Sequence, residues 1–312
     1  MFKYIGIIIF HILLLGGSIL AEQPYPKGDP IALSLPGDFY MAPQWSPEGS
    51  TVAATGPNFT GLYLLEFPNG NSIELSNAYS AGYEFSWSHD GSKIASRVST
   101  FENMRRKHSL VVFNVDDATF EIISEPRSKM VGVPRWSLND EHLYLTYAEK
   151  MESFNTLNST SPISEPVLFI KDGRIVLSPG SGLSEMSLLD MPDRVTSYSI
   201  SPDGSQIAFS SSGQNLWVAG SDGKNIVNLG TGIAPSWSPD GKWITCMVTH
   251  DDGHALLEAD LFLISPEDQS RTNITNTPDQ LEMHPKWSPD GNWIVFDTEG
   301  RGQLFVQQLE WK

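Results

Sequence analysis

The sequence predicts an all-β protein, a six-bladed β-propeller whose blades are four-stranded antiparallel sheets. Three observations predict it: a motif close to Trp-Ser-Pro-Asp-Gly recurs six times, an apolar strand-like segment follows each copy, and helical periodicity is nearly absent. The copies occupy residues 44–49, 86–91, 135–140, 199–204, 236–241 and 286–291. Their spacings are 42, 49, 64, 37 and 50 residues, which we attribute to loops of variable length between constant units.

The motif predicts a tight turn between two strands. Proline presets φ at the first corner, aspartate can accept a hydrogen bond from the nearby backbone, and glycine can adopt a positive φ. We therefore expect structural roles for the turn residues, and we expect the motif tryptophans to fill the space between neighbouring blades. These structural residues are Trp45, Trp87, Trp136, Trp237, Trp287, Asp203, Gly204, Asp240, Gly241, Asp290 and Gly291.

Further strands follow each motif. The third strands are expected at 62–65, 110–113, 167–170, 216–218, 261–264 and 304–306. Turns such as Asp172-Gly173 then lead into fourth strands. The sixth copy ends after its third strand, and an unpaired sheet edge is unfavourable, so we expect residues 30–35 to close the last blade. One propeller domain is thus predicted over residues 30–312, preceded by an N-terminal linker at 22–29.

The N-terminus predicts the compartment. Residues 1–21 contain Lys3, an apolar run from Ile5 to Leu15 and a small residue, Ala21, which is the pattern of a secretory signal peptide. An uncleaved membrane anchor is the alternative, because the whole apolar stretch approaches the length of a bilayer span. Under the first interpretation the mature protein is periplasmic or secreted and carries no membrane span.

Composition excludes several functions. The chain carries 20 Lys+Arg and 37 Asp+Glu, a formal net charge of −17, and this balance opposes nucleic-acid binding. A single cysteine, Cys246, allows no intrachain disulfide, and its apolar neighbours predict a buried strand position. The sequence lacks the Gly-x-Ser-x-Gly motif of serine hydrolases. We accordingly predict no catalytic residue and no cofactor.

The repeat resembles the WD-like propeller repeat of the TolB family. The resemblance covers residues 30–312 and is carried by Pro43-Gln44-Trp45, Pro134-Arg135-Trp136, Pro235-Ser236-Trp237 and Pro285-Lys286-Trp287. It implies a propeller that stands alone in the cell envelope, without the N-terminal domain of that family. Similar repeats also occur in prolyl-oligopeptidase-type and tricorn-type peptidases and in oligogalacturonate lyases, so the resemblance is more specific for fold than for function.

Loops on one face of the ring supply the candidate partner-binding residues. This face carries the connections between second and third strands and those between a fourth strand and the next blade. A basic loop at 101–107 and two long loops at 148–165 and 180–196 lie there, and loops on a rigid scaffold commonly carry function. The candidates are Phe101, Arg105, Arg106, Leu183, Met186, Leu189 and Met191. The alternative is that the apolar loop folds back on its own blades and the basic loop is solvated.

Three histidines are weaker candidates for a metal site. His250 and His254 lie in the loop of the fifth predicted blade, and His284 enters the sixth. Imidazole and carboxylate ligands suit a divalent cation, and oligogalacturonate lyases hold a metal with histidines in a propeller channel. No dense ligand spacing supports such a site here, so we predict no bound metal and treat these residues only as candidates.

The sequence favours a non-enzymatic binding protein that recognises a protein or peptide partner in the envelope and acts as a monomer. One alternative is a metal-assisted lyase or hydrolase that acts on a saccharide in the channel. Another is an accessory propeller that needs a separate peptidase chain.

Overall fold

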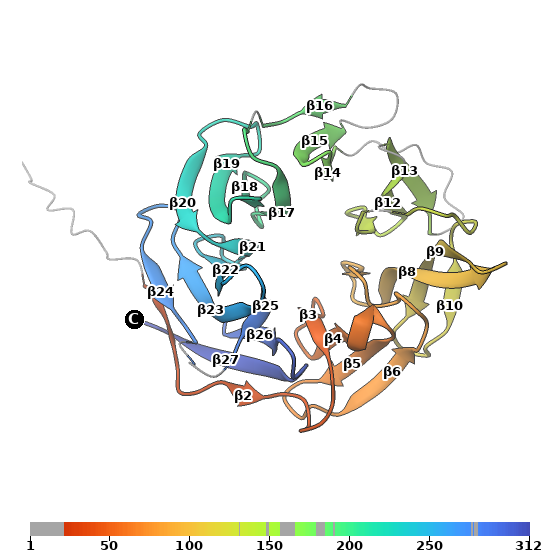
Figure 1. Ribbon diagram of the computed structural model, residues 1–312, viewed down its shortest axis with the longest axis horizontal. Coiled ribbons are helices and arrows are strands. Elements are labelled where there is room, and N and C mark those ends of the chain that lie inside the picture. The colour runs from red at the N-terminus through yellow and green to blue at the C-terminus, as the bar shows by residue number, and fades with distance from the viewer. Residues whose placement is uncertain are drawn as a thin grey trace, which may run out of the picture.

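The computed structural model describes residues 22–130, 132–147, 150–156, 166–178, 185–189, 191–275, 277 and 280–312. These residues form seven antiparallel sheets arranged in a ring (Figure 1). The prediction of an all-β propeller is therefore confirmed, but the predicted count of six blades is wrong. The expected signal peptide, residues 1–21, lies outside the described residues. Within those described ranges, no helix is long and apolar enough to cross a membrane.

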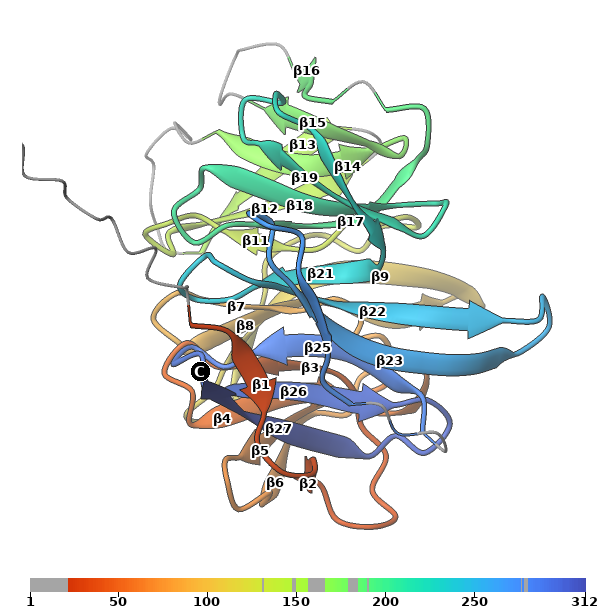
Figure 2. The ribbon, with the colours of Figure 1, turned by 90° about the vertical axis from the view of Figure 1, so that its left-hand side faces the viewer.

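We number the blades in chain order from the first motif, and blades 1, 2, 5 and 6 have four strands each. Blade 1 contains β3 (Met41–Trp45), β4 (Thr51–Thr55), β5 (Leu62–Glu66) and β6 (Ser72–Ser76), and blade 2 contains β7 (Ser86–Trp87), β8 (Lys93–Glu102), β9 (Arg105–Asn114) and β10 (Phe120–Ile122). Blade 5 contains β17 (Val195–Ile200), β18 (Gln206–Ser211), β19 (Asn215–Gly220) and β20 (Val227–Thr231). Blade 6 contains β21 (Ile233–Trp237), β22 (Ile244–Asp251), β23 (Leu256–Ile264) and β24 (Arg271–Asn273). Seen from the side, β22 and β23 extend beyond the neighbouring strands (Figure 2).

The extra blade lies between the third and fourth motifs. Blade 3 contains β11 (Arg135–Trp136), β12 (His142–Tyr147) and β13 (Lys150–Asn155), and blade 4 contains β14 (Val167–Lys171), β15 (Arg174–Ser178) and β16 (Met186–Ser187). Residues 167–170, predicted as the third strand of blade 3, instead pair with β15 in a separate sheet. Blade 4 carries no Trp-Ser-Pro-Asp-Gly motif, so counting motifs omitted it. The 64-residue spacing holds a whole blade rather than a long loop.

N-terminal residues close the ring in blade 7. This blade contains β25 (Glu282–Trp287), β26 (Trp293–Thr298), β27 (Leu304–Trp311), β1 (Pro24–Pro26) and β2 (Ile31–Ala32). Ile31 pairs with Val306, as expected for a closing strand. The segment expected to be a linker, 22–29, contains β1, in which Pro24 pairs with Trp311. The first and last described strands therefore share one sheet, which covers the edge of β27.

The core is divided among clusters that lie between adjacent blades. In one cluster Trp45 and Leu65 of blade 1 contact Val295 and Val306 of blade 7. Equivalent clusters join blade 1 to blade 2, blade 2 to blade 3, blade 4 to blade 5, blade 5 to blade 6 and blade 6 to blade 7. Cys246 is fully buried in the cluster between blades 5 and 6, and burial raises the pKa of its thiol to about 12. The ring is thus held by burial of apolar surface at blade interfaces.

The motif tryptophans lie at these interfaces. Four of them are 6% to 8% exposed: Trp45, Trp136, Trp237 and Trp287. Three donate an indole hydrogen bond to an inner-strand carbonyl of the preceding blade: Trp45 to Lys286 (3.2 Å), Trp136 to Ser86 (3.1 Å) and Trp237 to Ser199 (3.1 Å). Each of these three residues therefore fixes one blade against the next through packing and a hydrogen bond.

The turn residues organise the hairpin that follows each tryptophan. Asp203 accepts hydrogen bonds from the Ser201 hydroxyl (2.6 Å) and the Ser205 backbone N–H (3.0 Å), and these bonds lower its pKa to about 2. Gly204 has a φ of 71°, which favours glycine. The same arrangement recurs at three further turns, with Asp90, Gly91, Asp240, Gly241, Asp290 and Gly291.

Candidate functional site

A long hairpin formed by β8 and β9 dominates blade 2. Both strands have ten residues, and their pairing continues to Glu102 opposite Arg105. Asn103 and Met104 form the two-residue turn with positive φ values of 49° and 61°, as a type I′ turn requires. The segment 101–107, expected to be a loop, is therefore paired strand and turn. Figure 1 shows this hairpin extending outward from the ring.

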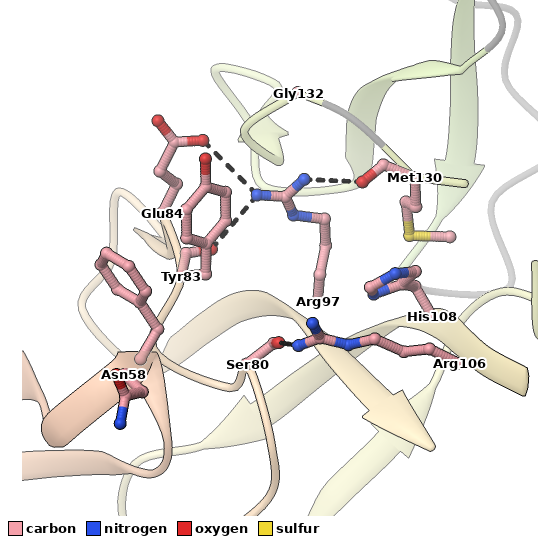
Figure 3. Close-up of a pocket in the computed structure, with 10 residues that line it drawn as sticks. Asn58, Ser80, Tyr83, Glu84, Arg97, Arg106, His108, Met130 and Gly132 are labelled. Carbon is pink, nitrogen blue, oxygen red and sulfur yellow. Dashed lines mark hydrogen bonds and ion pairs between the residues drawn. The ribbon is translucent and has the colours of Figure 1, made fainter. Parts of the chain in front are cut away.

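A cavity of about 380 Å³, which we call the loop-face pocket, lies at the base of this hairpin. Four parts of the chain line it: the 3₁₀ turn η1 (Pro57–Phe59), the β6–β7 connection, the strands β8 and β9, and the β10–β11 connection. The lining residues are Asn58, Phe59, Ser80, Tyr83, Glu84, Arg97, Arg106, His108, Met130 and Gly132 (Figure 3). The pocket therefore lies on the face predicted to carry the functional loops, hereafter the loop face.

Arg97 is the buried cation of this pocket. Arg97 is 5% exposed, and its guanidinium donates hydrogen bonds to the Met130 carbonyl (2.7 Å) and to the Tyr83 carbonyl (3.4 Å). It also forms an ion pair with Glu84 (3.4 Å) and lies 4.6 Å from the centroid of the Tyr83 ring. Within the described ranges its Nε has no hydrogen-bond partner. The chain thus supplies most of what a buried guanidinium needs.

Arg106 and His108 form the second polar group of the pocket. The Arg106 guanidinium donates to the Ser99 hydroxyl (3.1 Å) and to the Ser80 hydroxyl, as Figure 3 shows for Ser80. The His108 Nδ1 lies 2.9 Å from the Ser99 Oγ. Burial, and then the charges of Arg106 and Arg97, lower the pKa of His108, so the imidazole is neutral at neutral pH. The two arginines and Glu84 leave the pocket with one net positive charge.

Exposed apolar side chains lie towards the hairpin tip, beyond the strand residues that line the pocket. Phe101 is 62% exposed and Met104 is 98% exposed. The Phe101 ring lies 5.9 Å from the ring of Tyr79, which is itself 60% exposed. Together with Arg105, which is also exposed, these residues make an apolar and basic rim on an acidic protein.

The apolar candidates of the 180–196 segment lie elsewhere, around blade 4. Met186 is 54% exposed on β16, whereas Leu189 is 3% exposed and belongs to the core between blades 4 and 5. Met191 packs partly buried against the same cluster. Leu183 lies outside the described residues. The structure therefore does not join this group to Phe101, and Leu189 is a core residue rather than a surface residue.

The three histidine candidates do not form a ligand cluster with one another. His250 pairs with Glu258 across β22 and β23, and His254 lies in the turn that joins those strands. His284 Nδ1 lies 2.9 Å from Asp297 on β26. Burial opposes the charged form of His284, but the hydrogen bond and charge of Asp297 outweigh it and raise the pKa. Across the described residues, no group of three or more His, Cys, Asp or Glu side chains could hold a metal ion.

The sequence predicts only part of the pocket. It points to Arg106, but not to Arg97, His108, Tyr83 or Glu84. One signal was available, because Arg97 interrupts the otherwise small and apolar run of strand residues from Ile94 to Val98. A charged residue in a buried strand requires partners, and here those partners come from two other connections of the ring.

Comparisons with known proteins support the fold. No family model and no curated protein matches the chain. Among solved structures, a putative TolB from Agrobacterium tumefaciens is similar, with 17% identity and a TM-score of 0.54 over 88% of this chain and 91% of that chain. The C-terminal WD40 domain of Sif2 is also similar, with 15% identity and a TM-score of 0.57 over 87% of this chain and 81% of that chain. At these identities the likeness concerns the propeller fold alone.

Proposed function

We propose that this chain is a non-enzymatic binding propeller that holds a protein or peptide partner on the loop face. One observation carries the proposal: the β8–β9 hairpin, which supplies Arg97 and Arg106 to the pocket, also carries exposed Phe101 and Met104 towards its tip, with Phe101 paired to Arg106. Exposed apolar side chains next to cationic groups are typical of protein-binding surfaces.

The composition of the site favours a partner segment with a carboxylate next to an apolar residue. Arg106 is exposed at the pocket wall and can pair with a carboxylate, while Phe101 and Met104 offer apolar contact at the rim. Arg97 adds a second positive charge at the buried side of the pocket, where its carbonyl acceptors and Glu84 hold the guanidinium in place. Because strand pairing orders the hairpin up to its two-residue turn, binding requires little further ordering of this element.

The compartment is part of the same proposal. The charged, apolar and small residues of segment 1–21 support secretion or a periplasmic location. The likeness to a putative TolB supports an envelope role on grounds of fold only.

A photo-crosslinking experiment tests the proposal. A photoreactive phenylalanine analogue replaces Met104 on the loop face or, as a control, Leu138, which is 77% exposed in the motif turn of blade 3. Both proteins are irradiated in an envelope extract of the source organism, and the products are identified by mass spectrometry. We expect one defined product from position 104 that is absent from position 138.

A charge reversal adds specificity to that experiment. Arg106→Glu should abolish the product from position 104, whereas Lys242→Glu, an exposed residue in the motif turn of blade 6, should leave it unchanged. Identical products from positions 104 and 138, or a product that survives Arg106→Glu, would contradict the proposed surface.

A further inference from the structure

A second cavity, which we call the channel cavity, lies at the centre of the ring and is separate from the loop-face pocket. Its volume is about 440 Å³. Inner-strand residues of blades 1, 2, 3, 6 and 7 line it, together with Pro47, Pro239 and Pro289 of the motif turns. Inner strands run from the loop face towards these turns, so the cavity opens on the opposite side from the loop-face pocket.

The repeat places the residue directly before the tryptophan on the wall of this cavity in five of the six motifs. In every copy the residue at this position is half-buried. Five such residues line the cavity: Gln44, Ser86, Arg135, Ser236 and Lys286. All five are polar, two are cationic, and no Asp or Glu is among the described residues that line the cavity.

Neither cation of the cavity forms an ion pair with a described residue. Arg135 stacks on the Tyr198 ring at 4.6 Å, but among residues that the structure describes no carboxylate lies within 4.0 Å of Arg135 or Lys286. Burial, and then the like charge of Arg135, lower the pKa of Lys286. Leaving two like charges unpaired in a confined space is unfavourable, and it is conspicuous in a chain of net charge −17.

A hydroxyl group at the same wall also lacks a partner. The Ser86 Oγ is buried and forms no hydrogen bond with any residue in the described part of the chain. Buried polar groups in folded proteins are usually satisfied, so this hydroxyl is a donor without an acceptor on a strand that lines the cavity.

We propose that the channel cavity binds a small polyvalent oxyanion between Arg135 and Lys286. Two negatively charged oxygens would neutralise the two cations. Inorganic phosphate or sulfate and a small di- or tricarboxylate share this chemistry. The site does not depend on the proposed partner-binding function, because it uses different residues on the other side of the ring.

Isothermal titration calorimetry tests the site directly. The full chain, exchanged into chloride buffer, is titrated with inorganic phosphate, sulfate and citrate at constant ionic strength. We expect saturable binding of one or more of these anions with one site per chain. Arg135→Gln and Lys286→Gln should each weaken it by roughly tenfold or more, because each removes one charge-assisted hydrogen bond. The matched control is Lys242→Gln, which removes an exposed charge outside the cavity and should leave affinity unchanged.

The three titrations also distinguish the sources of the ligand. Binding of phosphate or sulfate alone assigns a tetrahedral anion, and binding of citrate alone assigns a polycarboxylate. If the wild-type chain binds none of the three, the proposal is overturned without reliance on any variant. Equal weakening by Lys242→Gln and Lys286→Gln would also overturn it, since the effect would then be general electrostatic screening.

Discussion

The cations of the loop-face pocket and those of the channel cavity differ in the partners that the chain provides for them. Arg97 is buried, yet it has two carbonyl acceptors, an ion-pair partner and an aromatic ring around it. Arg135 and Lys286 are less buried, yet within the described residues they lack any carboxylate partner. The difference indicates that Arg97 belongs to the folded structure itself, whereas the channel cations need a partner from outside the chain.

The largest expected effect comes from removing the satisfied cation. Arg97→Met should lower the free energy of unfolding by roughly 2–4 kcal/mol, because the buried carbonyl of Met130 and the half-buried bond to the Tyr83 carbonyl lose their donor. Urea denaturation measures this loss. Arg106→Met is the matched control, since Arg106 is exposed and should cost less. Equal losses in the two variants would show that burial of Arg97 is not what makes it structural.

The buried carboxyl group of Glu282 makes the stability of the protein depend on pH. Glu282 is 1% exposed, and burial, followed by the charge of Asp260, raises its pKa from 4.5 to about 7. The folded protein therefore holds this proton more tightly than the unfolded chain does. The stability that this group contributes falls as pH rises from about 4.5 through about 7, by roughly 3 kcal/mol in all.

The variant Glu282→Gln isolates this effect. Relative to wild type, its free energy of unfolding should be higher at about pH 8 than at about pH 5, because the neutral amide carries no charging penalty. Denaturant unfolding at both pH values measures the difference. A wild-type to variant difference that does not change with pH would mean that Glu282 titrates normally in the folded protein.

Two motif tryptophans differ in the same respect, since one indole N–H has a hydrogen-bond acceptor among the described residues and the other has none. The Trp136 indole N–H donates to the Ser86 carbonyl, whereas the Trp287 N–H has no partner in the described ranges. Both are similarly buried. Replacement by phenylalanine removes the N–H in each, so Trp136→Phe should cost about 1 kcal/mol more than Trp287→Phe. Thermal or chemical unfolding of the pair measures this gap, and the reverse order would contradict the structural role of the indole bond.

The repeat could be predicted from the sequence because its turns carry local chemistry. Asp203 and Gly204 need only their neighbours to form a turn, and the same is true of Asp240 and Gly241. Blade 4 was missed because β14 to β16 build a sheet without that motif. A blade defined only by strand pairing leaves a weaker local pattern than one defined by a conspicuous turn.

The candidate site was predictable only at its tip. Phe101 and Arg106 lie in a basic and aromatic segment that stands out in an acidic chain. The pocket below them brings together residues from Asn58 to Gly132, and only the packing of blades around the ring makes them neighbours. The two cations of the channel cavity could not be paired from the sequence either, because Arg135 and Lys286 are about 150 residues apart and become neighbours only in the closed ring.

Thermal unfolding of wild type and Lys286→Gln in chloride and in phosphate, at equal ionic strength, tests most directly whether the channel cations lack a partner. In chloride the variant should match wild type within about 0.5 kcal/mol or exceed it, because it relieves repulsion from Arg135. In phosphate wild type should be the more stable, because only the intact site gains binding energy. The predicted result is that phosphate increases the stability of wild type relative to the variant. A stability difference that is the same in both salts would contradict the account.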